Sequence, residues 1–220
     1  MVRTTTLGYP RIGRKRELKQ ACEAYWSGKI GEEDLYRTGA TLRRAHWQAQ
    51  RDAGIDLIPV NDFSFYDQVL DAIALIGAVP ERYRWEGELV DLDTYFAMAR
   101  GVQRVGLDAT AMEMTKWFDT NYHYIVPEWH TGQRFQIAST KLFDEFAEAQ
   151  AQDIPARPLL IGPFSLVLLG KAHNVRHQGG KCQAQNNPVD SLNGTHVLIA
   201  FSSAVGVASE MLRRKVRETL

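Results

Sequence analysis

Five basic side chains gather near the N-terminus, between positions 11 and 19. They are Arg11, Arg14, Lys15, Arg16 and Lys19. Apolar residues at helical spacing predict a helix from residue 14 to about residue 26, with four of these cations in its first two turns. Because a helix N-terminus already carries partial positive charge and free N–H groups, this placement is unfavourable unless an anion binds. The segment is a candidate site for carboxylates or phosphates, with solvated surface cations as the alternative.

Polar side chains also follow a predicted buried strand at residues 55–60. They are Asn61, Asp62, Ser64, Tyr66 and Asp67. In barrels and doubly wound folds, the loops after the strands carry the ligands. This segment is therefore a second candidate site. The alternative is an ordinary turn, because Asn, Asp and Ser favour turn and cap positions.

A third candidate lies in residues 113–124, where charged, amide and aromatic groups are mixed in one short run. Lys116 stands beside Trp117, and this pair could meet an anionic aromatic ligand by charge and stacking. The alternative is an aromatic packing cluster at a helix end.

Several function classes lack support in the sequence. The six histidines and two cysteines do not form a recognised metal-binding pattern, and no phosphate-binding glycine loop or serine-nucleophile motif is present. With 26 basic and 26 acidic residues the formal net charge is zero, which gives no field toward nucleic acid or a membrane. No apolar run reaches the roughly 20 residues of a membrane-spanning helix. We therefore expect a soluble protein in the reducing cytoplasm, without nucleic-acid or membrane partners.

The remaining pattern predicts an α/β fold. Strands are expected at 4–7, 55–60 and 157–163, with a possible strand at 135–138. Helices are expected at 14–26, 32–53, 68–75, 92–100 and 141–152, whereas 110–117 is helical or loop-like. This alternation is typical of right-handed crossovers and a parallel sheet, and it would bring loops 8–13 and 61–67 to one face. From residue 174 the chain becomes polar and glycine-rich, which predicts loop or disorder at 177–188.

Several motifs, taken in order, resemble the N-terminal domain of cobalamin-independent methionine synthase. The motifs are LGYPRIG at 7–13, RELK at 16–19, AGIDLIP at 53–59, NDFSFYD at 61–67, EMTKWF at 113–118, NYHY at 121–124, LIGP at 160–163 and LLGK at 168–171. The resemblance covers about residues 4–171. It implies a protein of two face-to-face β/α barrels that transfers a methyl group from 5-methyltetrahydropteroyl-polyglutamate to homocysteine.

The resemblance also implies site residues. The family segment that matches Arg16, Glu17, Leu18 and Lys19, and the lysine that matches Lys116, contact the folate with its oligoglutamate tail. The family's zinc ligands, His, Cys, Glu and Cys, belong to a C-terminal barrel that this sequence does not contain. No catalytic residue, metal ligand or cofactor is therefore expected within these 220 residues.

The expected fold is an incomplete (β/α)8 TIM-type barrel, with about three β/α units in residues 1–173 and a divergent tail in 174–220. Because similarity stops sharply after residue 171, we expect a truncated product, for example of a frameshifted gene, that is inactive by itself. An open parallel edge favours self-association or pairing with a separate C-terminal part. Two alternatives to an inactive remnant stay open: an interaction module, and a stand-alone binder of polyglutamylated folate.

Overall fold

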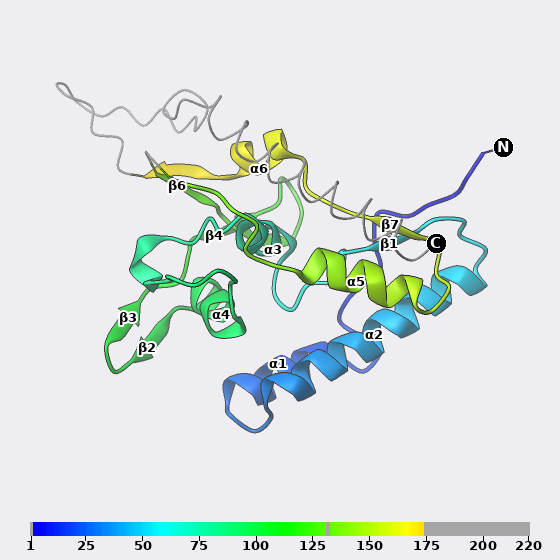
Figure 1. Cartoon of the computed structure of the whole chain (residues 1–220), viewed down its shortest axis with the longest axis horizontal. Coiled ribbons are helices and arrows are strands. Elements are labelled where there is room, and N and C mark those ends of the chain that lie inside the picture. Colours follow the sequence, from blue (N-terminus) through cyan, green and yellow to red (C-terminus); the bar gives the residue numbers. More distant parts are fainter. Residues whose placement is uncertain (1, 131–132, 174–220) are drawn as a thin grey trace. The chain divides into compact units, whose positions relative to one another are not determined.

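The computed structural model describes residues 2–130 and 133–173 and shows a mixed α/β protein with short parallel sheets (Figure 1). The predicted tail, residues 174–220, lies outside the described residues. The chain divides into two compact units, one formed by residues 1–68 and 141–160, the other by 69–140 and 161–220.

The first unit contains three helices and a short parallel sheet. The helices are α1 (Glu17–Trp26), α2 (Glu32–Asp52) and α5 (Lys141–Gln150), and the strands are β1 (Ile58–Val60) and β7 (Ala156–Pro158). β1 pairs with β7 in parallel. Thr5, in the N-terminal segment, forms a parallel bridge to Leu57, which directly precedes β1. The strands predicted at 55–60 and 157–163 are thus present as the shorter parallel pair β1 and β7, whereas residues 4–7 contribute only an isolated parallel bridge at Thr5.

Helices α1 and α2 lie side by side and bury an apolar stripe each (Figure 1). Three acidic residues, Glu32, Glu33 and Asp34, occupy the first turn of α2, where they complement the helix dipole. Gly54 ends the helix with φ of 79°, and the N–H of Ile55 donates to the carbonyl of Gln50. This left-handed glycine cap confirms the predicted stop at that residue.

The second unit holds the remaining elements. They are α3 (Gln68–Leu75), the 3-10 helix η1 (Glu81–Tyr83), α4 (Leu92–Arg100), β2 (Val102–Arg104), β3 (Leu107–Ala109), β4 (Met114–Lys116), β5 (His123–Ile125), β6 (Glu128–His130), α6 (Pro163–Leu169) and β8 (Lys171–His173). β2–β3 and β4–β5 are antiparallel hairpins, and β6 pairs with β8 in parallel. Fully buried Trp129 on β6 lies at the centre of this packing.

Two predicted elements differ from the structure, and two further elements were not predicted. Residues 114–116 form a strand, β4, in place of the helix or loop expected at 110–117. Residues 135–138 form no regular strand, because the N–H groups of Gln136 and Ala138 donate to the carbonyls of Ile76 and Leu75 at the end of α3. Helix α6 and strand β8 follow β7 where only a turn was expected; Pro163 at the first helical position favours this start.

Candidate functional site

The basic segment lies in the loop before α1, and only one of its cations is inside the helix. Gly13 has φ of 80° and Arg16 has φ of 63°, so the chain turns twice before the helix begins at Glu17. The predicted helix start at residue 14 is therefore wrong, and so is the placement of four cations in the first two turns. Lys19 alone lies in the helix, whereas Arg16 is its N-cap.

The side chain of Arg11 has a structural role. Its guanidinium donates to the carbonyl of Ser64 at 2.8 Å and to the carbonyl of Tyr66. In the same way, the N–H of Tyr9 donates to a carboxylate oxygen of Asp62 at 2.8 Å. Loops 8–13 and 61–67 therefore lie against each other, as predicted. Desolvation raises the pKa of Asp62, and the bond from Tyr9 opposes that shift.

Glu17 shapes the loop that carries the other cations. Its Oε2 accepts the backbone N–H of Lys15 at 2.9 Å. The backbone N–H groups of Glu17 and Lys15 lower the pKa of the Glu17 carboxyl group. The positive φ of Gly13 favours glycine there, and a Cβ would lie 2.2 Å from the same Oε2, so the Glu17 side chain would have to shift. Glu17 therefore acts on the backbone of the segment.

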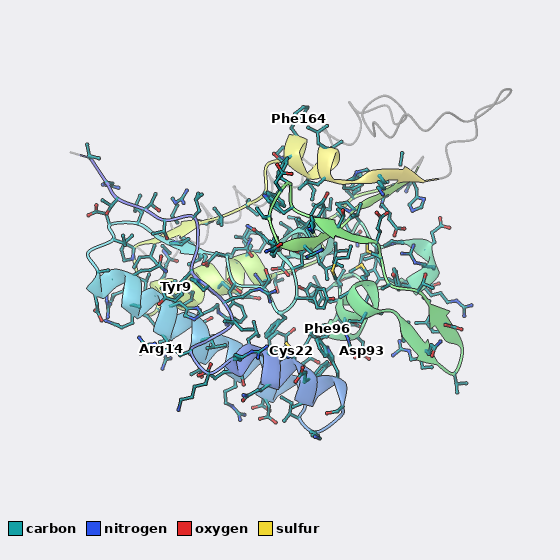
Figure 2. The ribbon with its side chains drawn as sticks, turned by 180° about the vertical axis from the view of Figure 1, so that it is seen from behind. Tyr9, Arg14, Cys22, Asp93, Phe96 and Phe164 are labelled. Atoms are coloured by element: carbon teal, nitrogen blue, oxygen red, sulfur yellow. The ribbon has the colours of Figure 1, made fainter. Side chains whose placement is uncertain are left out.

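The cations that remain accessible are Arg14, Lys15, Arg16 and Lys19. All four are exposed, and within the described part of the chain the side chains of the first three have no hydrogen-bond or ion-pair partner. Lys19 makes only a solvent-exposed pair with Glu23 at 3.5 Å, which contributes little. Tyr9 and Arg14 mark this loop in Figure 2. The loop thus presents positive charge to the solvent.

Leu18, also a predicted site residue, is 1% exposed and belongs to the core of the first unit. Its N–H donates to the carbonyl of Ile12. Its part in any ligand site is limited to holding its charged neighbours in place.

One contact in this region was not predicted from the sequence. The ring of His46 on α2 stacks on Tyr9, with the centroids 4.6 Å apart and the planes 26° from parallel. Burial lowers the pKa of His46, and the nearby Glu17 carboxylate opposes that shift. No local pattern signals such a pair, because the two residues are 37 positions apart.

Asn61 of the second candidate site joins elements of the first unit. It has φ of 65°, its side-chain amide donates to the carbonyl of Leu159 at 2.9 Å, and its Oδ1 accepts from Lys141 at 3.0 Å. Its backbone N–H donates to the buried carboxylate of Glu145 at 3.0 Å. These contacts favour the alternative, structural interpretation for Asn61.

Lys116 lies at the end of β4, in the second unit, opposite His123 on β5. Its side chain is exposed. The structure therefore brings together Arg16, Glu17, Leu18 and Lys19 at the start of α1, and it places Lys116 on a separate hairpin.

Within residues 2–130 and 133–173, no group of three or more His, Cys, Asp and Glu side chains could hold a metal ion. The zinc implied by the resemblance thus has no fitting site among these residues. In the same part of the chain, no helix is both long and apolar enough to cross a membrane.

Parallel β/α segments with an exposed basic loop after a strand are typical of α/β proteins that bind anionic ligands. The sequence model of one family, "Cobalamin-independent synthase, N-terminal domain", matches residues 3–188, and the chain belongs to this family. The match runs beyond the boundary predicted at residue 173, whose position stays a prediction.

Similar proteins carry one name, 5-methyltetrahydropteroyltriglutamate–homocysteine methyltransferase. The relative from Salinibacter ruber is 56% identical over 176 residues, which is 78% of this chain and 23% of the relative. The relative from Syntrophotalea carbinolica is 58% identical over 168 residues, with 76% and 22% covered. The relative from Acidithiobacillus ferrooxidans is 46% identical over 199 residues, with 86% and 25% covered. The chain thus spans about a quarter or less of the relatives' length.

Proposed function

We propose that this chain binds the polyglutamate tail of 5-methyltetrahydropteroyl-polyglutamate through the loop before α1. Lys116, on the β4–β5 hairpin of the second unit, is proposed as a separate contact for the same ligand. The observation that carries the proposal is the exposed, largely unpaired set Arg14, Lys15, Arg16 and Lys19. Two features support it: the relatives' names include a triglutamate ligand, and a chain of carboxylates is the natural counterpart of such a cluster.

The backbone of Arg16 is a second support. A non-glycine residue with φ of 63° is strained, and such strain is found preferentially where a side chain must be aimed at a ligand. The bond from the N–H of Arg16 to the carbonyl of Gly13 stabilises this conformation. Arg16 is thus held at the N-cap by the fold and not by an ion pair.

For the fold, we propose that the parallel strands are the first β/α units of a TIM-type barrel, with a boundary near residue 173. The two parallel pairs and the parallel bridge at Thr5 support this. The family reaction would need groups that the resemblance assigns to a C-terminal barrel. We therefore expect no methionine from homocysteine and methyl donor when the 220-residue chain is assayed alone with zinc.

Calorimetry of the 220-residue chain tests the binding proposal. Pteroyl-triglutamate should bind more tightly than the monoglutamate, because each added residue brings a carboxylate to the cations. The difference should shrink between about 0.1 M and 1 M salt, as the Debye length falls from about 10 Å to about 3 Å. Arg16→Ala and Lys19→Ala should each weaken triglutamate binding by up to about five-fold.

Lys29→Ala is the matched control. Lys29 is exposed, follows α1 at its far end, and loses the same charge when replaced. The ten residues of α1 separate it from the loop by about 15 Å. Equal losses for Lys19→Ala and Lys29→Ala would show a nonspecific charge effect, and no heat with the unmodified chain would refute the proposal.

One observation favours a second function, as an interaction module. Phe164 and Leu168, one turn apart on α6, are 58% and 47% exposed. Phe164 is labelled in Figure 2. We propose that this face packs on the remainder of a family protein, supplied separately. Co-purification with the C-terminal part of a relative, lost in Phe164→Ser with Leu168→Ser, would support this; a chain that neither pairs nor self-associates on sizing would refute it.

A further inference from the structure

Tyr9, which leads into the loop before α1, is held by the fold at two points. Its backbone N–H donates to Oδ2 of Asp62 at 2.8 Å, in the loop that follows β1. Its ring stacks on His46 of α2, with the ring centroids 4.6 Å apart. The exposed cations begin five residues later, at Arg14. The position of Tyr9 therefore determines where the segment that carries the cations leaves the body of the first unit.

The backbone next to Tyr9 lies directly against Asp62. Gly8 has φ of 144°, and a Cβ at this residue would lie 3.2 Å from both Cβ and Oδ2 of Asp62. Glycine is favoured there because it adopts this φ and lets the backbone approach the carboxylate closely. The bond between Tyr9 and Asp62 is therefore part of a close packing of the two loops.

An aspartate beside an anion-binding loop opposes the attraction of that loop for anions. Two cations face Asp62 from neighbouring helices, Arg43 of α2 and Lys141 of α5. Both are shared with other carboxylates, since Arg43 pairs with Glu148 at 2.6 Å and Lys141 pairs with Glu145 at 3.2 Å. These cations therefore do not cancel the charge of Asp62 completely, and its presence at this position requires another explanation.

Stability does not explain the carboxylate at position 62. Burial raises the pKa of Asp62, and the bond from Tyr9 and the two nearby cations offset that shift only in part. A raised pKa means that ionisation of the group lowers the free energy of unfolding at neutral pH, because the unfolded chain ionises it more readily. At Asp56, before β1, the sign is opposite: its carboxylate accepts the N–H of Thr4 at 2.7 Å, and the hydrogen bonds from Thr4 lower its pKa. Ionisation thus stabilises the fold at Asp56 and destabilises it at Asp62.

We propose that Asp62 is a positioning residue for the anion-binding loop before α1, and that it acts through the backbone N–H of Tyr9. The inference rests on the proposed function and deepens it, because it names the group that holds the loop in its binding shape. A hydrogen bond to an ionised acceptor is roughly twice as strong as one to a neutral acceptor. The charge of Asp62 therefore keeps the loop ordered before the ligand arrives. When that charge is lost, the apparent affinity falls in proportion to the ordered fraction of the loop.

Asp62→Asn separates this role from electrostatics and from stability. Asparagine keeps the size of the side chain and a neutral acceptor, and it removes one negative charge beside the cations. Charge alone predicts tighter anion binding by the variant, whereas positioning predicts weaker binding. The matched control is Asp56→Asn, which makes the same change in a carboxylate that also accepts a backbone N–H of the N-terminal segment, but at the opposite end of β1.

Calorimetry of the 220-residue chain with pteroyl-triglutamate near neutral pH measures binding. Thermal denaturation and hydrogen exchange of the Tyr9 amide are followed in parallel. Asp62→Asn should weaken binding by about three-fold or more, because the bond to Tyr9 loses its charged acceptor. It should also speed exchange of the Tyr9 amide, with a thermal midpoint that is unchanged or higher. Asp56→Asn should lower the thermal midpoint and leave the affinity unchanged.

Four results would contradict these expectations. If Asp62→Asn binds as tightly as the unmodified chain or more tightly, or if its Tyr9 amide exchanges at the unmodified rate, the inference is overturned while the proposed function stands. Equal losses of affinity in Asp62→Asn and Asp56→Asn, or a lower thermal midpoint in Asp62→Asn, would assign the effect to the fold in general and would also overturn the inference. If the unmodified chain does not bind pteroyl-triglutamate, the proposed function itself fails.

Discussion

Replacing Arg11 by methionine should destabilise the first unit, because Arg11 ties the basic loop to the loop after β1. Its two bonds to the carbonyls of Ser64 and Tyr66 involve a charged donor, and such bonds contribute about 1.5–3 kcal/mol each. Arg11 is half-buried, so water takes over part of both interactions in the variant. We therefore expect the free energy of unfolding to fall by about 2 kcal/mol, which is below the sum of about 3–6 kcal/mol for two fully shielded bonds.

Arg14→Met is the matched control, since Arg14 loses the same charge and gains the same side chain. Arg14 is exposed and has no recorded side-chain partner in the described chain, so its replacement should stay within about 0.5 kcal/mol. Urea denaturation followed by tryptophan fluorescence measures both, because Trp26 and Trp47 report on this unit. Arg11→Lys should fall between wild type and Arg11→Met, because one ammonium group reproduces a two-carbonyl fork poorly. Equal midpoints for Arg11→Met and Arg14→Met would refute the structural role of Arg11.

Three further predictions concern single residues. Arg16→Gly should be more stable than Arg16→Ala by about 1 kcal/mol in thermal denaturation, because glycine adopts the left-handed N-cap conformation without strain. The reverse order would show that the backbone at residue 16 is not strained. Because burial lowers the pKa of His46 below its usual 6.5, the folded state takes up its proton less readily than the unfolded chain does. The contribution of neutral His46 to the free energy of unfolding should therefore be fully present above pH 6.5, and it should be lost as the pH falls through the lowered pKa. His46→Phe, which keeps a ring against Tyr9, should flatten this decline in urea midpoints measured across pH. An unchanged slope would show that another ionisable group causes the decline. Gly170→Ala should lower stability by about 2 kcal/mol or more, because a Cβ there would lie 2.1 Å from Nε1 of buried Trp129. Gly162→Ala, at the N-cap of the same helix that Gly170 caps at its C-terminus, would meet only Ser165 Oγ at 3.9 Å and should stay within about 1 kcal/mol.

The sequence predicts best those helices whose apolar periodicity and capping residues lie within the helix itself. Helices α3 and α4 have the predicted bounds, and α2 ends at the predicted glycine, because apolar periodicity and caps lie within the helix itself. The start of α1 was misplaced by three residues. Residues 14–16 fit the helical pattern, but the left-handed backbone of Arg16 and the contact of Gly13 with Glu17 form a turn that apolar periodicity does not signal.

The candidate site was predicted in part for the same reason. The cluster of cations and the neighbouring loop at 61–67 could be identified from residue type and order. The structural role of Arg11 could not, because its partners are carbonyl groups, which every residue carries and no sequence pattern marks. The stack of Tyr9 on His46 likewise depends on how α2 packs, and neither residue type signals it.

The separation of Arg11 from the other cations changes what the basic loop can bind. With Arg11 occupied by two carbonyls, the accessible charges are Arg14, Lys15, Arg16 and Lys19, and the carboxylates of Glu17 and Glu23 oppose them. The loop therefore has a modest positive excess, carried by side chains that are all exposed. Such a loop favours an extended ligand with several separated carboxylates over a single compact anion, because each exposed pair contributes only about 0.2–1 kcal/mol and binding requires several of them together. Binding should thus increase with the number of glutamates, and a single glutamate or inorganic phosphate should bind poorly; equal affinity for phosphate and the triglutamate would show that the loop recognises charge alone.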